Sequence, residues 1–148
     1  MMKRSVIWLL AAILPLATAV AQPATSDAPL ALNRMAASLK WGPCPPIYKG
    51  GCALAVLHGD PAKPNADVFL RVDGGTLLHN HRHSSAERMI LVSGTLRVAY
   101  AGSAPAVLQT GHYAYGPAGV PHEAACLSKT PCTLFIAFEG PVDADLVK

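Results

Sequence analysis

The feature that most constrains the fold is a series of short apolar segments that begins near Cys52 and continues almost to the end of the 148-residue chain. Clusters of Gly, Pro, Asn and Asp separate these segments, and such clusters favour turns. Ser93-Gly94, between two of the segments, predicts a tight hairpin turn. No long helical pattern follows residue 40, so the sequence predicts an all-β sandwich or barrel. The expected strands are Ala53–Leu57, Val68–Val72, Met89–Val92, Thr95–Tyr100, His112–Tyr115 and Thr133–Phe138.

The first residues have the pattern of a secretory signal peptide. Lys3 and Arg4 precede an unbroken apolar run over Val6–Leu14, and Ala19-Val20-Ala21 provides a small-x-small cleavage site. The run is shorter than the roughly 20 residues that a membrane span needs. We therefore expect an exported protein, periplasmic or secreted, with no membrane span after cleavage.

The predicted organisation is a signal peptide over residues 1–21, a flexible N-terminal segment over 22–40, and one domain over 41–148. The segment begins with Ala, Pro, Thr and Ser, a composition typical of a tether. Within it, Leu32–Leu39 is long enough for one or two turns of helix, which Trp41-Gly42-Pro43 would end.

Composition and charge exclude two classes of protein. A hydrophobic share of 51% is too high for a disordered chain. Cleavage after Ala21 removes two of the twelve basic side chains and none of the nine acidic ones, so the net charge falls from +3 to +1. Such a balance argues against nucleic-acid binding, because a protein that binds nucleic acid needs a basic patch to release counterions from the phosphates.

Four cysteines follow the predicted cleavage site, and an even number in an exported chain indicates disulfides. Three pairings are possible. Short separations favour Cys44–Cys52 and Cys126–Cys132, each of which would close a loop rich in turn residues. A Cys44–Cys132 bond would instead fasten the N-terminal segment to the domain.

Four of the six histidines form a pattern with one carboxylate. His79, His81 and His83 alternate along the chain, and alternate residues of a strand share one face. Glu87 follows a polar turn and is expected to begin the next strand beside them, whereas His122 lies much further along. Neutral imidazoles together with one carboxylate suit a divalent transition metal. Fe, Mn, Ni, Cu and Zn all fit such a set, and the sequence does not choose among them.

Two spacing motifs contain these residues. The first has intervals of five, one, three and six residues between Gly75, His81, His83, Glu87 and Gly94. The second has intervals of five, one and two residues between Gly111, Pro117, Gly119 and His122. In both motifs the sequence resembles the cupin superfamily, over roughly Ala53 to Glu139. Within it, the chain is similar to small exported single-domain cupins of unassigned activity, including ChrR-like cupins.

The resemblance implies a jelly-roll β-barrel of two antiparallel sheets that forms a single domain. It also implies one divalent transition metal inside the barrel, held by His81, His83, Glu87 and His122, and a possible homodimer. The second motif usually closes with Asn four residues after its histidine, but Cys126 stands there in this chain. The residues that surround the ligands therefore differ from those of relatives.

The main alternative for these four residues is a degenerate cupin that has kept them without using a metal. His79 has its own alternatives, because it is either a further donor at the pocket or a partly exposed side chain at a strand end. We favour the second and expect metal binding to be independent of His79.

Other polar residues are expected to lie outside the metal site. His58 and His112 have no motif spacing and are assigned to the surface or to the surroundings of the ligands. Tyr113 and Tyr115 would either line the pocket or pack in the wall of the barrel, and we favour packing in the core. The strand arginines would either orient an anionic substrate or lie on the solvated face, which is their usual position; they are Arg71, Arg88 and Arg97.

Two classes of function remain. The first is a metal-dependent oxidoreductase of the dioxygenase type that acts on a small anionic or enolisable molecule, with two metal positions left for substrate and O₂. Glu87 would serve there as a ligand and also as a proton acceptor. The second is a non-catalytic periplasmic protein that binds a metal or a small ligand. Isomerase or decarboxylase activity would use the same ligands as the first class.

Overall fold

The computed structural model describes residues 28–147, so the predicted signal peptide over 1–21 and the first part of the 22–40 segment lie outside it. From Leu32 onward the described chain forms one unit. It contains eleven β-strands and no helix, which confirms the prediction of an all-β fold. No helix among residues 28–147 is long and apolar enough to cross a membrane.

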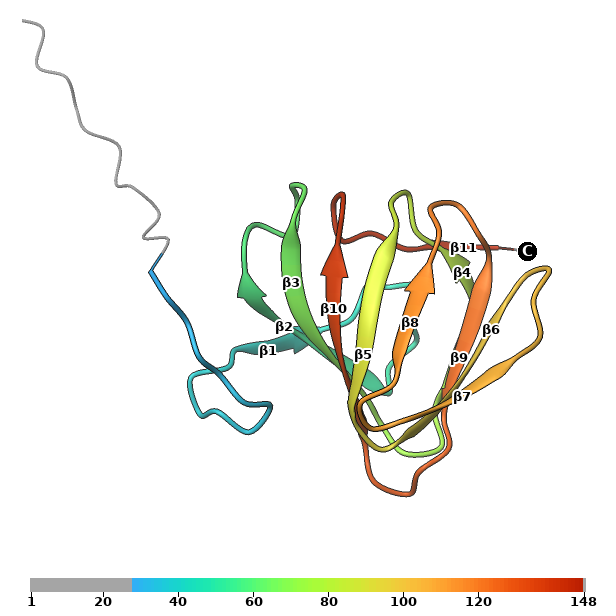
Figure 1. Ribbon diagram of the computed structural model, residues 1–148, viewed down its shortest axis with the longest axis horizontal. Helices are drawn as coiled ribbons and strands as arrows, with labels where there is room; N and C mark the ends of the chain where they lie inside the picture. Colours follow the sequence, from blue (N-terminus) through green and yellow to red (C-terminus); the bar gives the residue numbers. More distant parts are fainter. Residues whose placement is uncertain (1–27, 148) are drawn as a thin grey trace, which may run out of the picture. The chain divides into compact units, whose positions relative to one another are not determined.

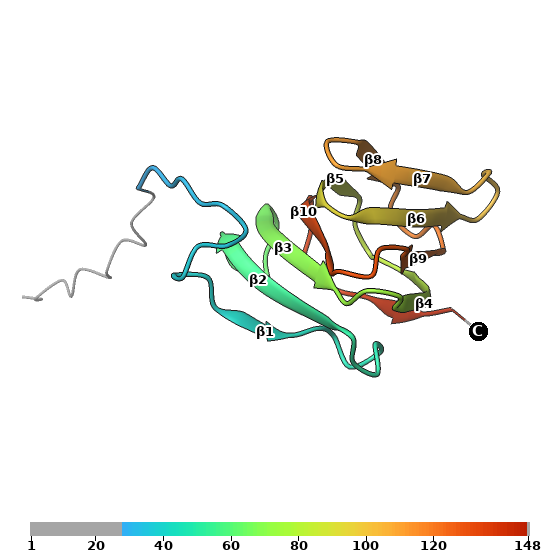
Figure 2. The ribbon, with the colours of Figure 1, turned by 90° about the horizontal axis from the view of Figure 1, so that it is seen from below.

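The strands form two antiparallel sheets that face each other (Figures 1 and 2). The first sheet has six strands in the order β1-β2-β3-β10-β5-β8: β1 Trp41–Pro43, β2 Cys52–His58, β3 Ala66–Val72, β10 Cys132–Phe138, β5 Glu87–Ser93 and β8 Tyr113–Gly116. The second has five strands in the order β11-β4-β9-β6-β7: β11 Asp145–Leu146, β4 Leu77–Arg82, β9 His122–Cys126, β6 Thr95–Tyr100 and β7 Ala106–Gln109.

The main hydrophobic core lies between the two sheets. Alternate residues of each strand point inward, which is the pattern expected when one face of a sheet is buried. Val68 and Leu134 enter this core from the six-stranded sheet, and Leu96 and Val98 enter it from the five-stranded sheet. The short apolar segments of the sequence are thus the inner layers of a jelly-roll sandwich.

The chain passes from one sheet to the other at Gly94. β5 belongs to the six-stranded sheet and β6 to the five-stranded sheet, so the predicted hairpin at Ser93-Gly94 is wrong. Gly94 has a φ of +95°, and a Cβ there would lie 2.8 Å from Cys132 Sγ. The residue type that suggested a hairpin turn is therefore needed for a close crossing between layers.

Both favoured disulfides are present. Cys126 ends β9 and Cys132 begins β10, so their bond links the five-stranded sheet to the six-stranded sheet. Cys44–Cys52 closes the loop between β1 and β2. No cysteine of the described chain is free. These bonds fit an oxidising, extracellular environment.

The N-terminal residues of this unit pack on the outer face of the six-stranded sheet. Two successive turns, closed by Ala36 N–H to Asn33 O and Leu39 N–H to Ala36 O, replace the helical turns expected over Leu32–Leu39. Leu39 is buried against Ala55 and Phe69, which point away from the main core. This contact forms a second, smaller hydrophobic cluster outside the barrel.

The tyrosines of β8 are exposed. Tyr113 and Tyr115 retain 56% and 47% of their accessible surface, so the expectation that they pack in the core is wrong. Gly116, which alternates with them, is buried and faces inward, and β8 is the edge of its sheet. The alternation was predicted correctly, but the outward face was taken for the inward one.

Candidate metal centre

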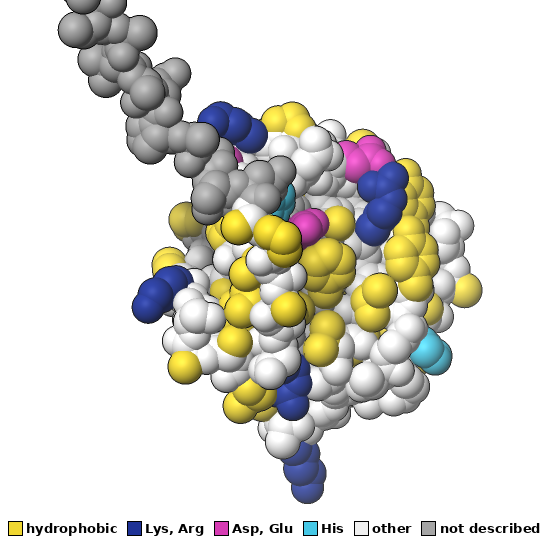
Figure 3. Space-filling model, turned by 60° about the vertical axis from the view of Figure 1, so that its left-hand side comes forward, with side chains coloured by type: hydrophobic (Ala, Val, Ile, Leu, Met, Phe, Trp, Pro, Cys, Tyr) yellow, Lys and Arg dark blue, Asp and Glu magenta, His cyan; other side chains and the backbone are white. Residues whose placement is uncertain are grey.

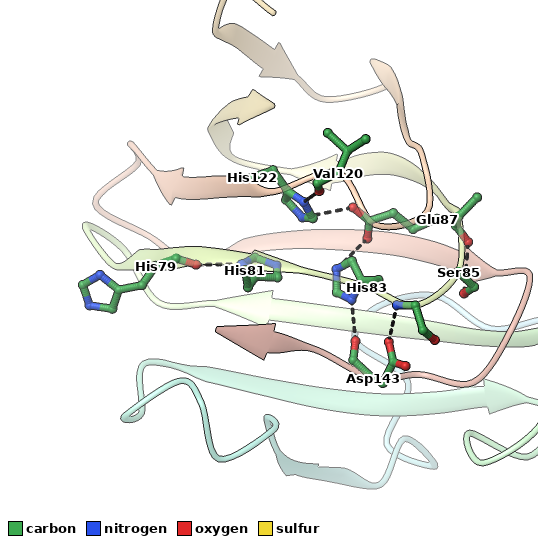
Figure 4. A network of polar contacts seen from close by, with 10 residues as sticks. His79, His81, His83, Ser85, Glu87, Val120, His122 and Asp143 are labelled. Carbon is green, nitrogen blue, oxygen red and sulfur yellow. Dashed lines mark hydrogen bonds and ion pairs between the residues drawn. The ribbon is translucent and has the colours of Figure 1, made fainter. Parts of the chain in front are cut away.

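Three of the predicted ligands meet inside the barrel at one end of the five-stranded sheet. His81 lies on β4 and is paired in register with His122, the first residue of β9. His83 follows directly after β4. All three side chains are buried, and one ligand nitrogen from each lies within 4.8 Å of the other two (Figure 4). These three histidines could hold a metal ion.

The backbone fixes the orientation of each imidazole. The Nδ1 atom of His81 donates to His79 O at 2.7 Å, and that of His122 donates to Val120 O at 3.2 Å. His83 Nδ1 donates to the main-chain oxygen of Asp143. A proton on Nδ1 leaves Nε2 as the free acceptor atom of each ring. The hydrogen bonds therefore select the tautomer that a metal ligand requires.

Glu87 approaches the histidines from the opposite sheet. It begins β5, as predicted, but β5 lies across the barrel and is not the neighbour of β4. Its Oε1 lies 3.3 Å from His122 Nε2, and its Oε2 lies 3.5 Å from His83 Nε2. The space for the carboxylate depends on Gly116, because a Cβ there would lie 2.8 Å from Oε1. Residues of both sheets thus contribute to one cluster.

Burial keeps this cluster uncharged. Loss of water lowers the pKa of His81 to about 3 and that of His122 to about 4, and it lowers the pKa of His83 as well. The same desolvation raises the pKa of Glu87 to about 8. A buried cation would lower the pKa of Glu87 again, since it favours the carboxylate form.

Two buried oxygen atoms at the centre have no hydrogen-bond partner within the described chain. They are Glu87 Oε1 and the hydroxyl oxygen of Tyr100. The Tyr100 hydroxyl is close enough to oppose part of the rise in the Glu87 pKa, but neither atom meets hydrogen-bond geometry. Unpaired buried acceptors are costly. A carboxylate oxygen of this kind, close to the Nε2 atoms of two of the three clustered histidines, fits a divalent cation.

The histidines and Glu87 line a small cavity inside the barrel. Its volume is about 50 Å³, and most of its wall consists of apolar side chains from both sheets, such as Met89 and Leu134. Tyr48, from the loop closed by Cys44–Cys52, packs its ring edge-on to His81 with 5.1 Å between the centroids. The site therefore has room for an ion and a ligand of a few atoms.

His79 does not join the cluster. A register shift between Leu78 and His81 interrupts the pairing of β4 with β9, so simple alternation fails at this point. The His79 side chain is exposed and points away from the other rings, while its carbonyl oxygen holds His81 (Figure 4). The inference that it shares the ligand face is wrong, whereas the position that we favoured, at the exposed end of a strand, agrees with the structure.

Sequence reasoning missed three residues that contact the ligands. Tyr48 lies in a loop, Tyr100 ends β6, and Asp143 lies in the C-terminal segment, where its carboxylate accepts the Ser84 N–H at 2.9 Å. None of them belongs to either spacing motif. Only the three-dimensional arrangement of the loops brings them to the centre.

None of the arginines that the structure describes lines this cavity. Arg88 pairs with Glu139, and Arg97 pairs with Glu123 at 2.7 Å. The Arg71 guanidinium lies over the Trp41 ring. His58 and His112 are exposed. The arginines thus have the solvated positions that we regarded as usual.

A family model confirms the relationship that the motifs indicated. The model of the ChrR cupin-like domain matches residues 33–143, which is more than half of the chain. The chain belongs to the cupins. No curated protein matches its sequence significantly.

Solved structures of other cupins share the fold. An RmlC-like cupin from Shewanella frigidimarina is 23% identical with a TM-score of 0.58, and the match covers 70% of this cupin and 85% of that chain. DMSP lyase DddQ from Ruegeria pomeroyi is 19% identical with a TM-score of 0.61, covering 74% and 61%. An oxalate oxidase is 18% identical with a TM-score of 0.56, covering 66% and 55%. The chain thus spans little more than half the length of these two enzymes.

Proposed function

We propose that this cupin binds one divalent transition metal through His81, His83, Glu87 and His122 and acts as a metal-dependent oxidoreductase of the dioxygenase type. The observation that carries the proposal is a cluster of three buried histidines with ligand nitrogens within 4.8 Å of one another, two of which also approach a buried carboxylate whose Oε1 has no hydrogen-bond partner in the described chain. Structural roles rarely require four buried polar side chains in an apolar cavity. When bound, the metal supplies a positive charge that stabilises an enolate or carboxylate, together with redox chemistry toward O₂.

The substrate proposed is a small anionic or enolisable molecule. The cavity of about 50 Å³ limits it to a few non-hydrogen atoms unless the Tyr48 loop moves. The apolar wall excludes water and strengthens electrostatic interactions at the centre. Oxalate oxidase, a structural neighbour studied with the substrate analogue glycolate, acts on a molecule of this size and charge.

Glu87 has a second proposed role as a proton acceptor. Its carboxylate is the one acidic group among the cavity-lining side chains that also contacts two imidazoles. Burial raises the pKa of Glu87 in the metal-free chain, whereas a bound cation would lower it and keep the carboxylate deprotonated, the form that accepts a proton. The Tyr100 hydroxyl, which lacks a hydrogen-bond partner in the described chain, lies close enough to Glu87 to influence its pKa and would modulate its proton affinity.

We place the reaction outside the cytoplasm, in the periplasm or the secreted fraction. The two disulfides support this location, because such bonds persist in oxidising compartments. The pattern of residues 1–21 is the second argument.

A non-catalytic binding protein is the alternative, and one observation favours it. Tyr48 and Pro45 line the cavity from a loop that Cys44–Cys52 closes, so the ion would lie behind a braced cover. In that case the metal would stabilise the barrel or hold a small ligand without turnover.

The test is elemental analysis of protein purified from its native compartment, followed by oxygen-uptake measurements with small carboxylates and enolisable ketones. The proposal expects about one transition metal per chain and oxygen uptake that Glu87→Gln abolishes. Metal at full occupancy without turnover of any substrate would favour the binding protein. Absence of metal from the purified protein, even after loading, would refute both functions.

A further inference from the structure

A second hollow lies on the outer face of the six-stranded sheet, on the side away from the metal centre. It has a volume of about 390 Å³, within the usual range for small-molecule sites. Figure 3, turned to bring the β1–β2 side of Figure 1 forward, shows hydrophobic side chains gathered on this face with basic side chains around them. Its lining includes Arg34, Trp41, Arg71, Ser93 and Thr133.

The strand register explains the hollow. Ala53, Arg71, Thr133 and Ser93 lie side by side across β2, β3, β10 and β5. Arg71 is the one large side chain in this row, so short neighbours leave space on both sides of its guanidinium. These residues alternate with the inward-facing core residues, and the hollow is therefore separate from the metal cavity.

Arg71 is held in place without losing its hydrogen-bond donors. Its guanidinium carbon lies 4.4 Å from the centre of the Trp41 ring, a cation–π arrangement that fixes the plane of the group. No carboxylate pairs with Arg71 within residues 28–147, nor with Arg34, whose recorded partner is the sulfur of Met35. A stacked guanidinium with free N–H groups is suited to bind a planar or tetrahedral oxyanion.

Hydroxyl groups complete the polar side of the hollow. Ser93 belongs to the lining, but its Oγ is shielded from solvent and does not face the space. Thr133 and Thr130 also line the space, and no acidic residue within 28–147 does. The loop that carries Thr130 lies between Cys126 and Cys132, so their disulfide limits its movement. The donors thus occupy fixed positions around a space of positive charge.

We propose that this hollow binds a small organic anion, with its carboxylate or phosphate group on Arg71 and Arg34 and its apolar body against Met35 and Pro131. The charge of the lining favours an anion. Two arginines that lack a carboxylate partner line the space, and no acidic residue of the described chain does. The apolar side chains in the lining, such as Met35 and Pro131, favour an organic molecule over a bare ion. Binding here does not require the metal.

Calorimetry with phenyl phosphate as the probe tests the proposal, using the full chain with and without loaded metal. Fluorescence of Trp41 provides a local readout, since the other tryptophan, Trp8, lies in the predicted signal peptide. Benzoate distinguishes a carboxylate from a phosphate, inorganic phosphate tests the anion alone, and benzyl alcohol tests the apolar body alone. The variants are Arg71→Gln and Arg34→Gln. Arg97→Gln is the matched control, because it removes the same charge from the other sheet.

We expect saturable one-to-one binding of phenyl phosphate or benzoate, weakened about tenfold or more by Arg71→Gln and several-fold by Arg34→Gln. Arg97→Gln and His122→Ala should leave this binding unchanged, and melting temperatures identify any variant that has not folded. Arg34 is exposed, so its replacement tests the site even if Arg71→Gln unfolds. Equal loss in Arg71→Gln and Arg97→Gln, tighter binding of inorganic phosphate than of both organic anions, or no saturable signal would overturn the proposal.

Discussion

At the scale of single residues, the geometry of the candidate metal centre depends on main-chain atoms. Each Nδ1 atom donates to a carbonyl oxygen, and these oxygens belong to His79, Val120 and Asp143. Replacement of those three side chains leaves the carbonyls in place. Positions next to the ligands are therefore expected to tolerate substitution better than the ligands themselves.

Loss of any proposed ligand should remove the metal. Alanine at His81, His83 or His122, or Gln at Glu87, is expected to lower metal affinity at least about tenfold and to abolish the rise in melting temperature on loading. His79→Ala is the matched control, because this exposed side chain lies two residues from His81 and only its main chain serves the site. Metal content and thermal melts of the five variants after identical loading provide the measurement. Retained metal in His83→Ala with loss in His79→Ala would contradict the ligand assignment.

The carboxyl of Glu87 should give the metal-free protein an unusual pH dependence. Its pKa is raised to about 8, so its contribution to stability is present below its ordinary pKa and is lost as the pH rises toward 8. Between pH 6.5 and 8 this costs at most about 2 kcal/mol, since one proton corresponds to about 1.4 kcal/mol per pH unit. The histidines have lowered pKa values and stay neutral over this interval.

Glu87→Gln should therefore make the metal-free protein more stable at pH 8 and remove this decline. Urea unfolding in the presence of a chelator at pH 6.5 and 8 measures both effects. The same variant should be less stable than the wild type once metal is loaded. A metal-free variant that is less stable than the wild type at pH 8 would contradict the raised pKa.

Motif spacing was enough to predict which residues come together at the candidate centre but not what surrounds them. The intervals around His81, Glu87 and His122 were read directly from the sequence, and the structure brings these residues together. Periodicity alone misplaced His79, because a bulge in β4 changes the face that it occupies. Alternation also cannot tell inside from outside in an edge strand, and for this reason Tyr113 was assigned to the core.

At the scale of elements, the passage between β5 and β6 depends on the absence of a side chain at Gly94. Gly94→Ala should destabilise the protein by about 1–3 kcal/mol, because it combines a positive φ with a contact of 2.8 Å to Cys132 Sγ. Gly102→Ala separates the two causes, since Gly102 also has a positive φ, +78°, but nothing within 4 Å of its Cβ position. Chemical denaturation should show the larger loss for Gly94→Ala. Equal losses of stability in the two variants would mean that the contact with Cys132 Sγ adds no cost.

The disulfide between β9 and β10 should contribute more to the stability of the fold than the one in the β1–β2 loop. The double variant Cys126→Ala/Cys132→Ala is expected to lose about 2–3 kcal/mol, through loop entropy and the loss of a covalent link between the sheets. Cys44→Ala/Cys52→Ala breaks a loop of similar length that lies outside the main core and should cost less. Urea unfolding of both double variants under the same conditions decides the point. The opposite order would show that the link between sheets adds nothing.

Most strands were predictable because each is a short apolar run between turn residues, as in β3 and β6. β7 and β9 were not predicted: β7 has only four residues, β9 consists mainly of Ala and polar residues, and both pair with β6. The partners of a strand were also not predictable. Ser93-Gly94 and the turn before Glu87 have the composition of hairpins, yet both connect different sheets.

At the scale of the whole molecule, the candidate metal centre forms where the two sheets face each other. His81, His83 and His122 belong to one layer and Glu87 belongs to the other. The cluster therefore does not exist in either sheet alone. Its formation requires the complete core between the sheets, including Leu91 and Leu96.

This division has a consequence for the choice of ion at the proposed centre. First-row divalent ions differ in preferred ligand distance by only about 0.1–0.2 Å, and metal sites tolerate errors of about that size. The separation of the layers is set by apolar side chains, so a core substitution that moves the sheets by a few tenths of an ångström changes the fit of the carboxylate. Selection for one metal over another can thus act on residues that never touch it. Two cupins with the same four ligand residues need not use the same metal.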